Sequence, residues 1–385
     1  MKLLLLAEGD AERWEAWSGS AKSLVDHLRG AGHDVATADV DLYGVSRGIA
    51  AALTFSAHRK RWGVKYHLTG AAYRWRSQRA ARLVVKHASR LDGILQIGAT
   101  FDPPASAGRP YGVFCDSNIV MSQEGAAYGV SDTAWLRADE SDVIRRRETR
   151  VYHSASVVFT ISDYLRRSFI EAFELSEDRV CTVGAGPNLD LSRIPPPRAR
   201  CRDGIPTILF VGKQFERKGG TILLEAFRIV RGTVPEARLV IIGPGASGPA
   251  EPGVKWVGHL DKNRPDEWAR LAQAYQDADV FCLPSLFEPF GIVFIEAMFF
   301  GLPCVGTAEW AIPEMIIDGH TGYTVPRGHA AALADRLLGL LTNRPRAHEM
   351  GLAGRRHAEE RFTWNGVAQR MATRLESCRL SPLPS

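Results

Sequence analysis

The sequence predicts an α/β protein with two domains, each built around a parallel β-sheet. Short apolar runs alternate with amphipathic helical patterns along the chain, as in successive βα units. A proline-rich, basic segment at 188–206 interrupts this alternation, which then starts again. The 385 residues suffice for two such domains with a sizeable core in each. Ligands of open α/β sheets bind at the carboxyl ends of the strands, so we expect the two sheets to face a central cleft.

The individual elements follow from apolar runs and from glycine and proline signals. The first half predicts a helix that ends at a glycine, 20–32, and strands at 2–7, 33–40, 92–98, 111–116, 156–162 and 180–184. The second half predicts helices at 219–232, 266–278 and 296–300, and strands at 207–212, 237–243, 254–258, 279–284 and 303–307. The predicted domains are therefore 1–188 and 207–363, joined by a linker at 189–206.

Composition excludes several classes of protein. An apolar content of 45% and a net charge of +5 fit a globular protein with some affinity for anions and do not identify a nucleic-acid binder. The six cysteines form no CxxC pair, which argues against a zinc knuckle or a redox dithiol. Those in apolar runs are expected to be buried thiols of a reducing compartment. The apolar start is shorter than a signal-peptide core, and no apolar run reaches transmembrane length, so we expect a cytoplasmic protein.

One glycine motif resembles a dinucleotide fingerprint. IIGPGASG matches GxGxxG through Gly243, Gly245 and Gly248, directly after a predicted strand. Dinucleotide binding requires a helix to begin there, but prolines and another strand follow. A nicotinamide-dependent enzyme is therefore a distant alternative.

A lysine pair follows the first strand of the second domain. In FVGKQFERKGG, Gly212 and Lys213 end the strand, and Lys218 precedes two glycines and a helix. Glycines allow close approach of a ligand, and helix N-termini favour anions. The two lysines suit a diphosphate, whose developing charge they would neutralise. The alternative is a solvated basic turn.

Two glutamates lie in otherwise apolar surroundings in FEPFGIVFIEAMFFGLP. Glu288 belongs to a loop, and IVFIEAMFF predicts a helix with Glu296 just inside it. The amides of Phe290, Gly291 and Ile292 would lie unpaired at the start of that helix. Acceptors beside exposed donors suit a polyhydroxylated ligand, although a helix-end charge and a salt-bridge partner are the alternative roles. Together with the lysine pair, they form a coherent nucleotide-sugar site.

These motifs resemble those of the retaining glycosyltransferases of family 4. The resemblance rests on GKQFERKGG, on PSLFEPFGIVFIEAMFFGLPCV about seventy residues later, and on IPEMIIDGHTGYTV. It extends more thinly to the first domain, through WSGSAKSLVDHLRGAGHDV and RRETRVYHSASVVFTISDYLRRSF. It implies the GT-B fold, with two Rossmann-like domains. The first would bind the acceptor and the second the nucleotide-sugar donor, and a C-terminal helix at 364–380 would pack back on the first.

The resemblance also implies roles for individual residues. Lys213 and Lys218 would contact the donor diphosphate, Glu288 the hydroxyls of the donor sugar, and Glu296 those of the ribose. Gly19 would let the diphosphate approach the first domain. Three amides beside Glu288 and the glycine before the first lysine complete the implied donor site: Phe290, Gly291, Ile292 and Gly212. Retention in this family is usually explained by front-face transfer, in which the leaving phosphate helps take the proton of the acceptor.

The chain departs from the family pattern at two places. Many members carry a histidine at the end of a first-domain strand, where RPYGVFCDSNIV has Asp116. This aspartate would orient the donor sugar or the acceptor hydroxyl, or else cap the strand end. Members often have a glycine pair before the PE of TAEWAIPEM, where Trp310 and Ala311 stand here. Their bulk would reshape the donor-sugar pocket.

A basic stretch at 58–90 contains ten Lys and Arg residues, four aromatic Trp and Tyr residues, and no acidic residue. Three interpretations compete: a patch that contacts an anionic bilayer at the inner face of the membrane, a wall of the pocket for an anionic acceptor, and a solvated helix face whose tryptophans pack inside. An RNA-binding interpretation lacks any accompanying motif.

The sequence thus predicts a retaining, metal-independent glycosyltransferase without a cofactor. It would transfer a sugar from a nucleoside-diphosphate donor to a hydroxyl of a lipid, a polysaccharide or a small metabolite. The proposed catalytic residues are Lys213, Lys218, Glu288 and Asp116. The alternatives are a sugar-phosphate synthase or phosphorylase on the same fold, and a non-catalytic nucleotide-sugar-binding protein. No nucleic-acid partner is expected.

Overall fold

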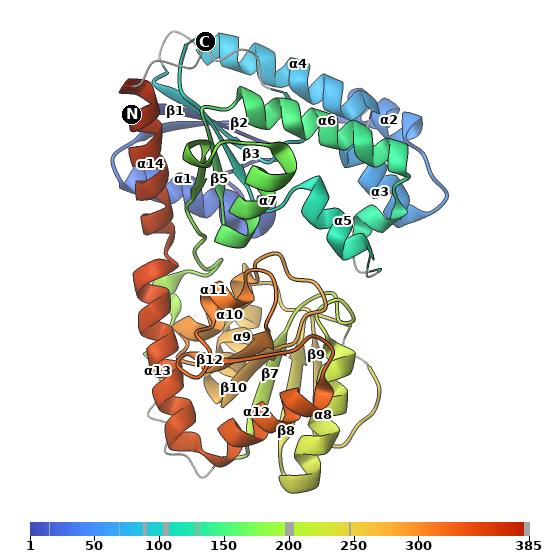
Figure 1. The fold of residues 1–385 in the computed structure, drawn as a ribbon, viewed down its shortest axis with the longest axis vertical. Coiled ribbons are helices and arrows are strands. Elements are labelled where there is room, and N and C mark those ends of the chain that lie inside the picture. Colours follow the sequence, from blue (N-terminus) through green and yellow to red (C-terminus); the bar gives the residue numbers. More distant parts are fainter. Residues whose placement is uncertain are drawn as a thin grey trace. The chain divides into compact units, whose positions relative to one another are not determined.

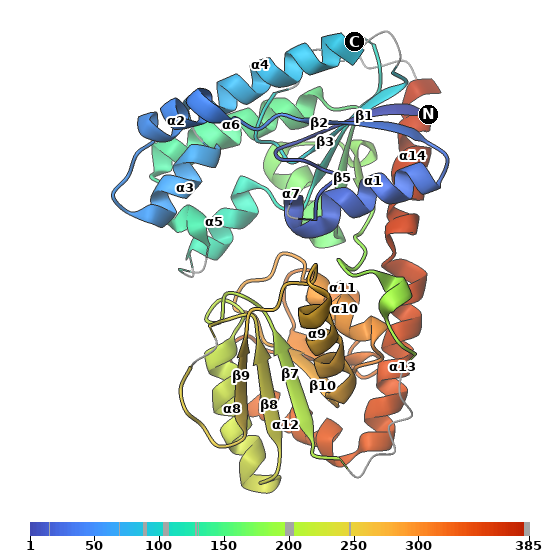
Figure 2. The same ribbon diagram turned by 180° about the vertical axis from the view of Figure 1, so that it is seen from behind.

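The computed structural model describes residues 1–380 apart from 15, 69, 88–90, 103–107, 128, 130, 197–203 and 246–247. Cys201 and part of the predicted linker and of the basic stretch lie outside the described residues. The chain divides into two compact units (Figures 1 and 2). The first comprises Met1–Gly186 and Trp364–Ser385, and the second comprises Pro187–Thr363.

The first unit is built on a parallel sheet of six strands in the order β2-β1-β3-β4-β5-β6. The strands are β1 (Lys2–Ala7), β2 (Asp34–Asp39), β3 (Gly93–Ile97), β4 (Tyr111–Cys115), β5 (Val157–Thr160) and β6 (Val180–Thr182). Every residue of β3, β4 and β5 is buried, because helices cover both faces of a parallel sheet. All six predicted strands of this half are present, with shifts of one or two residues at their ends.

The helices of the first unit include one from the far end of the chain. They are α1 (Ser20–Gly30), α2 (Gly44–Leu53), α3 (Arg59–Leu68), α4 (Gly70–His87), α5 (Ile119–Ala127), α6 (Ala138–Ser154), α7 (Asp163–Phe173) and α14 (Trp364–Leu380). Helix α14 packs against α1 and β5. Glycines permit this contact: a Cβ atom on Gly112 would lie 3.2 Å from Leu375, and one on Gly186 would lie 2.5 Å from the Trp364 ring.

The second unit has its own six-stranded parallel sheet, in the order β12-β11-β10-β7-β8-β9. The strands are β7 (Thr207–Val211), β8 (Arg238–Ile242), β9 (Val254–Gly258), β10 (Val280–Leu283), β11 (Cys304–Thr307) and β12 (Gly322–Val325). The helices are α8 (Gly220–Thr233), α9 (Pro265–Asp277), α10 (Ile292–Phe299), α11 (Ile312–Met315), α12 (Ala330–Thr342) and α13 (Arg344–Arg361). Helices α8 and α12 cover one face of this sheet and α9 covers the other (Figures 1 and 2). The predicted α/β class with two parallel sheets is confirmed.

The glycine motif after β8 does not open a helix. Among the described residues between Gly243 and Gly253 the chain forms loops and turns, and it then enters β9. The GxGxxG match therefore lacks the helix N-terminus that would hold a pyrophosphate.

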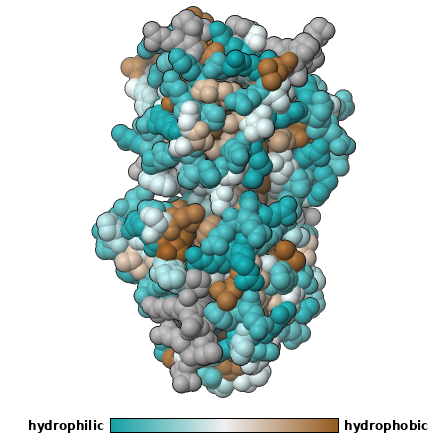
Figure 3. All heavy atoms as spheres, turned by 90° about the vertical axis from the view of Figure 1, so that its left-hand side faces the viewer, coloured by the Kyte–Doolittle hydropathy of each residue, from teal (hydrophilic) through white to brown (hydrophobic). Residues whose placement is uncertain are grey.

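None of the described helices combines the length and the apolarity needed to cross a bilayer. The face shown in Figure 3 is mainly hydrophilic, with small separate apolar patches of the kind that folded proteins commonly expose. Cys282 and Cys304 are buried free thiols, as expected from their apolar runs.

Candidate functional site

The candidate site of the second unit lies where its strands end. Lys213 and Lys218 follow β7, Lys262 follows β9, and Glu288 follows β10. Since all the strands are parallel, their carboxyl ends meet at one edge of the sheet. The structure thus gathers at this edge residues that are about seventy positions apart in the sequence.

Glycines let the loops at this edge approach one another closely. A Cβ atom on Gly243 would lie 2.6 Å from the backbone of Gly212, so the loops after β7 and β8 meet backbone to backbone. Gly219 has φ +73°, and a Cβ atom there would lie 1.9 Å from the carbonyl oxygen of Pro284. Only glycine fits this position, because both the backbone conformation and the contact exclude a side chain. Gly219 therefore fixes the loop that carries Lys218 against the end of β10.

Lys218 and Glu288 form an ion pair. Their side chains are only 12% and 7% exposed, so the pair is largely shielded from water. Burial lowers the pKa of Lys218, and the negative charge of Glu288 opposes that shift. The hydroxyl of Ser285 lies 3.3 Å from the same carboxylate. By contrast, Lys213 is exposed, and no ion pair of this lysine is found among the described residues.

The loop after Glu288 ends at an open helix N-terminus. Gly291 has φ +97° and caps α10 without a side-chain hydrogen bond. Among the described residues, none accepts a hydrogen bond from the amides of Phe290, Gly291 or Ile292. These amides supply hydrogen-bond donors and the positive end of the helix dipole beside the carboxylate of Glu288.

Glu296 lies in the second turn of α10 and is fully buried. Its carboxylate accepts a hydrogen bond from Lys262 Nζ at 2.5 Å, and the hydroxyl of Tyr275 lies 3.5 Å away. Lys262 is a site residue that the sequence analysis missed. The sequence does carry a signal for this residue: Lys262 comes four residues after the end of β9, so it lies at the same edge of the sheet as the other residues of the candidate site.

Trp310 adopts a backbone conformation that favours glycine. Its φ is +58°, in the left-handed region that bulky residues rarely occupy. The ring packs edge-on against Phe287 at 5.7 Å, and the guanidinium of Arg327 lies 5.7 Å from its centre. Because Phe287 directly precedes Glu288, the indole lies next to the loop that carries this glutamate. Ala311, the second residue of the pair, is fully buried.

In the first unit, Asp116 and Gly19 lie at strand and helix ends. Asp116 directly follows β4 and is exposed. Gly19 has φ +94° and precedes α1, and Trp17 and Ser18 before it also have positive φ angles, of 51° and 54°. Positive φ angles at residues other than glycine store backbone strain, which concentrates in segments that bind ligands.

An acid–base cluster follows β1 in the same unit and was missed from the sequence. Glu8 forms an ion pair with Arg76, whose Nη2 lies 2.8 Å from its carboxylate, and it lies 2.6 Å from His67 Nδ1. Burial alone would raise the pKa of Glu8, but His67 and Arg76 outweigh it and lower this pKa. Arg76 is fully buried, so this part of the basic stretch serves the interior of the unit.

Comparison with known proteins shows which proteins this chain is similar to. Residues 205–343 match the family model described as "Glycosyl transferases group 1". The chain is 32% identical over 253 residues to the D-inositol 3-phosphate glycosyltransferase of Corynebacterium aurimucosum, and the match covers 60% of this chain and 59% of the relative. It is 36% identical over 222 residues to the phosphatidyl-myo-inositol mannosyltransferase of Mycobacterium leprae, where the match covers 55% of this chain and 56% of the relative. The chain thus spans less than two thirds of the length of these two relatives.

Among solved structures, the fold is similar to that of a sucrose-phosphate synthase from Thermosynechococcus elongatus. The TM-score is 0.64 at 19% identity, and the superposition covers 98% of both chains. Both units are similar to this structure, because the aligned region covers nearly the whole chain. This chain therefore resembles the family 4 glycosyltransferases: residues 205–343 match the group 1 glycosyl transferase model, and the whole chain has a fold similar to the GT-B fold.

Proposed function

We propose that this protein is a retaining glycosyltransferase that transfers a sugar from a nucleoside diphosphate to an acceptor hydroxyl. The observation that carries the proposal is the Lys218–Glu288 ion pair beside the unpaired amides that begin α10, within the segment that matches the family model. A cation and three amides suit the phosphates of a donor, and carboxylates suit hydroxyls of its sugars.

The ion pair suggests how the donor would bind. Before binding, Lys218 and Glu288 neutralise each other inside the protein. A donor would break this ion pair. Its phosphate oxygens would attract the ammonium group of Lys218, and its sugar hydroxyls would donate hydrogen bonds to the carboxylate of Glu288. Glu296 would accept from the ribose hydroxyls in the same way, in exchange with Lys262.

The chemistry would then rest on positioning and on electrostatic stabilisation. The C1–O bond to the diphosphate breaks while the acceptor oxygen bonds to C1 from the same face, and the leaving phosphate takes the acceptor proton. Lys213, Lys218 and the amides at the start of α10 would stabilise the negative charge that develops on the diphosphate. We propose that these groups make a metal ion and a cofactor unnecessary, and that Asp116 orients the acceptor hydroxyl.

A thermal-shift screen against UDP, GDP, TDP, ADP and NADH tests the donor class. A nucleotide at about 100 times its dissociation constant stabilises the fold by about 2.7 kcal/mol, which is readily measured. We expect one nucleoside diphosphate to raise the melting temperature and NADH to leave it unchanged. Calorimetry on Lys218→Ala and Glu296→Ala then locates the site, because each variant should bind that nucleotide more weakly. Unchanged affinity in both variants would contradict the placement.

Turnover separates the enzyme from the alternatives. Sugar nucleotides of the selected base are incubated with inositol phosphate and phosphatidylinositol, since the names of the two relatives describe such acceptors. Transfer with a retained anomeric configuration supports the proposal. Binding without transfer to any acceptor would favour a non-catalytic sugar-nucleotide-binding protein, and transfer to a free sugar phosphate would favour the synthase.

We also propose that α2 and the basic stretch contact an anionic membrane surface. The aromatic residues of the basic stretch are packed inside or half-buried, but α2 and the loop after it expose an apolar stripe: Val45, Ile49, Leu53 and Phe55. The chain carries no acidic residue from Leu42 to Leu91, and exposed cations such as Arg59, Arg74 and Arg82 follow the stripe. An apolar helix face followed by helices that expose basic residues fits an anionic bilayer, to which each exposed cation adds about 1 kcal/mol.

Vesicle sedimentation tests this contact. We expect the protein to bind vesicles that contain phosphatidylglycerol and to lose binding when Leu53 is replaced by glutamine. Equal binding of Leu53→Gln and the parent protein, or equal binding to phosphatidylcholine vesicles, would contradict it.

A further inference from the structure

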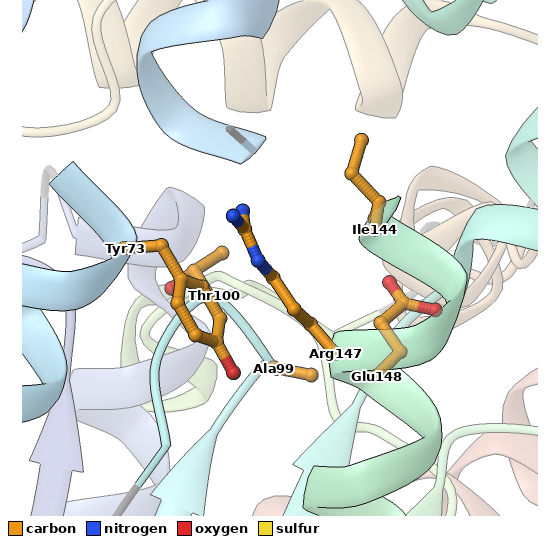
Figure 4. A pocket seen from close by; sticks show the side chains of 6 residues that line it. All are labelled: Tyr73, Ala99, Thr100, Ile144, Arg147 and Glu148. Atoms are coloured by element: carbon orange, nitrogen blue, oxygen red, sulfur yellow. The ribbon is translucent and has the colours of Figure 1, made fainter. Parts of the chain in front are cut away.

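A buried acid on α6 takes no part in the chemistry proposed above. Glu148 is 9% exposed, and with residues such as Tyr73 and Arg147 it lines a cavity of only about 40 Å³ (Figure 4). Such a volume holds at most a few water molecules and excludes a sugar ring. Glu148 therefore does not reach a sugar substrate, and any part that it plays in transfer must act through another residue.

No cation offsets the charge that Glu148 would carry. In Figure 4 the guanidinium group of Arg147 extends on the side of Tyr73, away from the carboxyl group of Glu148. Burial raises the pKa of Glu148 to about 8, and in the described part of the chain none of the groups that oppose this shift is a cation. A buried acid without a countercharge is costly, and groups with strongly shifted pKa values concentrate at functional sites.

Glu148 contacts the loop at the end of β4. Its Oε2 accepts a hydrogen bond from the amide of Ile119 at 2.9 Å, and this amide is the first of α5. The first amides of a helix have no partner within the helix, so the carboxyl group supplies the acceptor here. Tyr152, one turn further along α6, hydrogen-bonds to Glu148 and to the thiol of Cys115, the last residue of β4. Glu148 thus links α6 to both ends of the loop 116–118.

A second anchor holds the same loop from α7. Asn118 is 3% exposed and caps α5, since its Oδ1 accepts a hydrogen bond from the amide of Met121 at 2.9 Å. Its Nδ2 donates to the hydroxyl of Ser168 on α7 at 3.0 Å. The loop begins with Asp116, which is exposed directly after β4. An exposed aspartate on a loop that two helices fix suits a group that must keep one orientation.

We propose that Glu148 is a positioning residue: through the amide of Ile119 it holds the loop that presents Asp116 to the acceptor. The inference rests on the proposed function, in which Asp116 orients the acceptor hydroxyl. Without the oxygen of Glu148, the amide of Ile119 is left unpaired, the loop is released from α6, and Asp116 samples several orientations. A misplacement of about 1 Å can cost about 100-fold in rate, whereas the donor residues of the second unit are not affected.

Hydrogen exchange tests the hold on the loop without any substrate. Backbone exchange of the segment 116–122 is followed by mass spectrometry in the parent protein, in Glu148→Met and in Glu148→Gln. We expect Glu148→Met to speed the exchange of this segment about tenfold or more relative to that of β10, because a buried amide loses its partner. Glu148→Gln keeps an oxygen that accepts from Ile119 and should exchange at the rate of the parent. Glu171→Met, at an exposed position on α7, is the matched control and should also leave the rate unchanged.

A second variant removes the same hydrogen bond from the side of its donor. Ile119→Pro lacks the amide hydrogen, and proline is well accepted at the first position of a helix. This variant keeps the test decisive if Glu148→Met does not fold. Ile119→Val retains the amide and is its control, so we expect faster exchange of the remaining segment in the proline variant alone.

Transfer kinetics test the role of the loop in the reaction. We expect Glu148→Met to lower kcat about tenfold or more at unchanged calorimetric affinity for the nucleoside diphosphate, and Glu148→Gln to retain most of the rate. A loss of stability alone would not spare the donor affinity and the glutamine variant in this way. In Asp116→Ala, the further change Glu148→Met should have little effect on kcat, because Glu148 acts through Asp116.

The outcomes separate this inference from the proposed function. Faster exchange in Glu148→Met, with no transfer by the parent protein to any acceptor, would support the hold of Glu148 on the loop and refute the transferase. Equal exchange rates in Glu148→Met and the parent would overturn the inference. A loss of kcat from Glu148→Met that is as large in Asp116→Ala as in the parent protein would overturn it as well.

Discussion

Replacement of Glu148 by glutamine is expected to change how stability depends on pH. Glu148 lies on α6, is 9% exposed, and accepts a hydrogen bond from the amide of Ile119 at 2.9 Å. Burial raises the pKa of this carboxyl group to about 8 from an ordinary value of about 4.5. Glutamine has nearly the same shape and keeps an oxygen that accepts from Ile119, but it does not titrate.

The sign of the effect follows from proton binding. Between about pH 4.5 and about pH 8 the folded protein holds a proton on Glu148 that the unfolded chain has released. The contribution of Glu148 to stability is therefore fully present below about pH 4.5, and it is lost as the pH rises through about 8. A difference of about 3.5 pKa units corresponds to about 5 kcal/mol in total, of which about 3 kcal/mol falls between about pH 5 and about pH 8.

Chemical denaturation at a series of pH values measures this effect. Urea unfolding of Glu148→Gln and of the parent protein gives the difference in unfolding free energy at each pH, provided that the slopes agree. We expect the unfolding free energy of the glutamine variant, relative to that of the parent, to increase by about 3 kcal/mol as the pH rises from about 5 to about 8. Glu171→Gln, at an exposed position on α7, is the control and should keep the profile of the parent. Parallel curves for Glu148→Gln and the parent would refute the argument from burial.

Other predictions concern the second unit. Lys218→Met should destabilise the fold by about 3–5 kcal/mol in urea unfolding, because Glu288 would be left buried and unpaired, and Lys218→Met with Glu288→Gln should recover much of that loss. Gly219→Ala should reduce both the melting temperature and nucleotide affinity, since its Cβ atom would lie 1.9 Å from a backbone oxygen, and a variant as stable as the parent would contradict the close contact. Trp310→Gly should broaden the range of donor sugars in a transfer assay, because it removes the indole that packs against Phe287 beside Glu288; unchanged donor selectivity would show that the indole does not border the sugar. Lys262→Met should alter calorimetric affinity for a ribonucleotide more than for its 2′-deoxy analogue, and equal changes would place the lysine away from the ribose.

The fold could be predicted from the sequence because each strand carries its own local signal. Runs such as those of β7 and β10 are short, almost wholly apolar and followed by glycine or proline, which is typical of buried parallel strands. The loop that begins α10 was recognisable for the same reason, since proline and glycine precede an apolar helix. Local sequence patterns therefore predicted the strands of both sheets except β12, and they placed Lys213, Lys218 and Glu288 in loops that follow strands.

The pairing of charges could not be predicted in this way. Lys218 and Glu288 are seventy positions apart, and only the parallel arrangement of β7 and β10 brings them into contact. Lys262 contacts Glu296 for a similar reason. The sequence predicts β9, the strand that Lys262 follows, but it does not predict which strands lie beside β9 in the sheet. Composition alone was also insufficient for the basic stretch, since its tyrosines pack inside and most of the exposed apolar side chains belong to α2 and the loop after it.

The packing of α14 has a consequence for the order in which the protein can fold during synthesis. The first unit is discontinuous, because its last helix is made after the whole second unit. As the chain leaves the ribosome, residues 187–363 can complete their sheet while α1 and β5 still lack the partner that covers them. The second unit is therefore expected to be the first to reach its final fold, although it comes later in the sequence, and a chaperone that protects apolar surface would act mainly on the N-terminal unit.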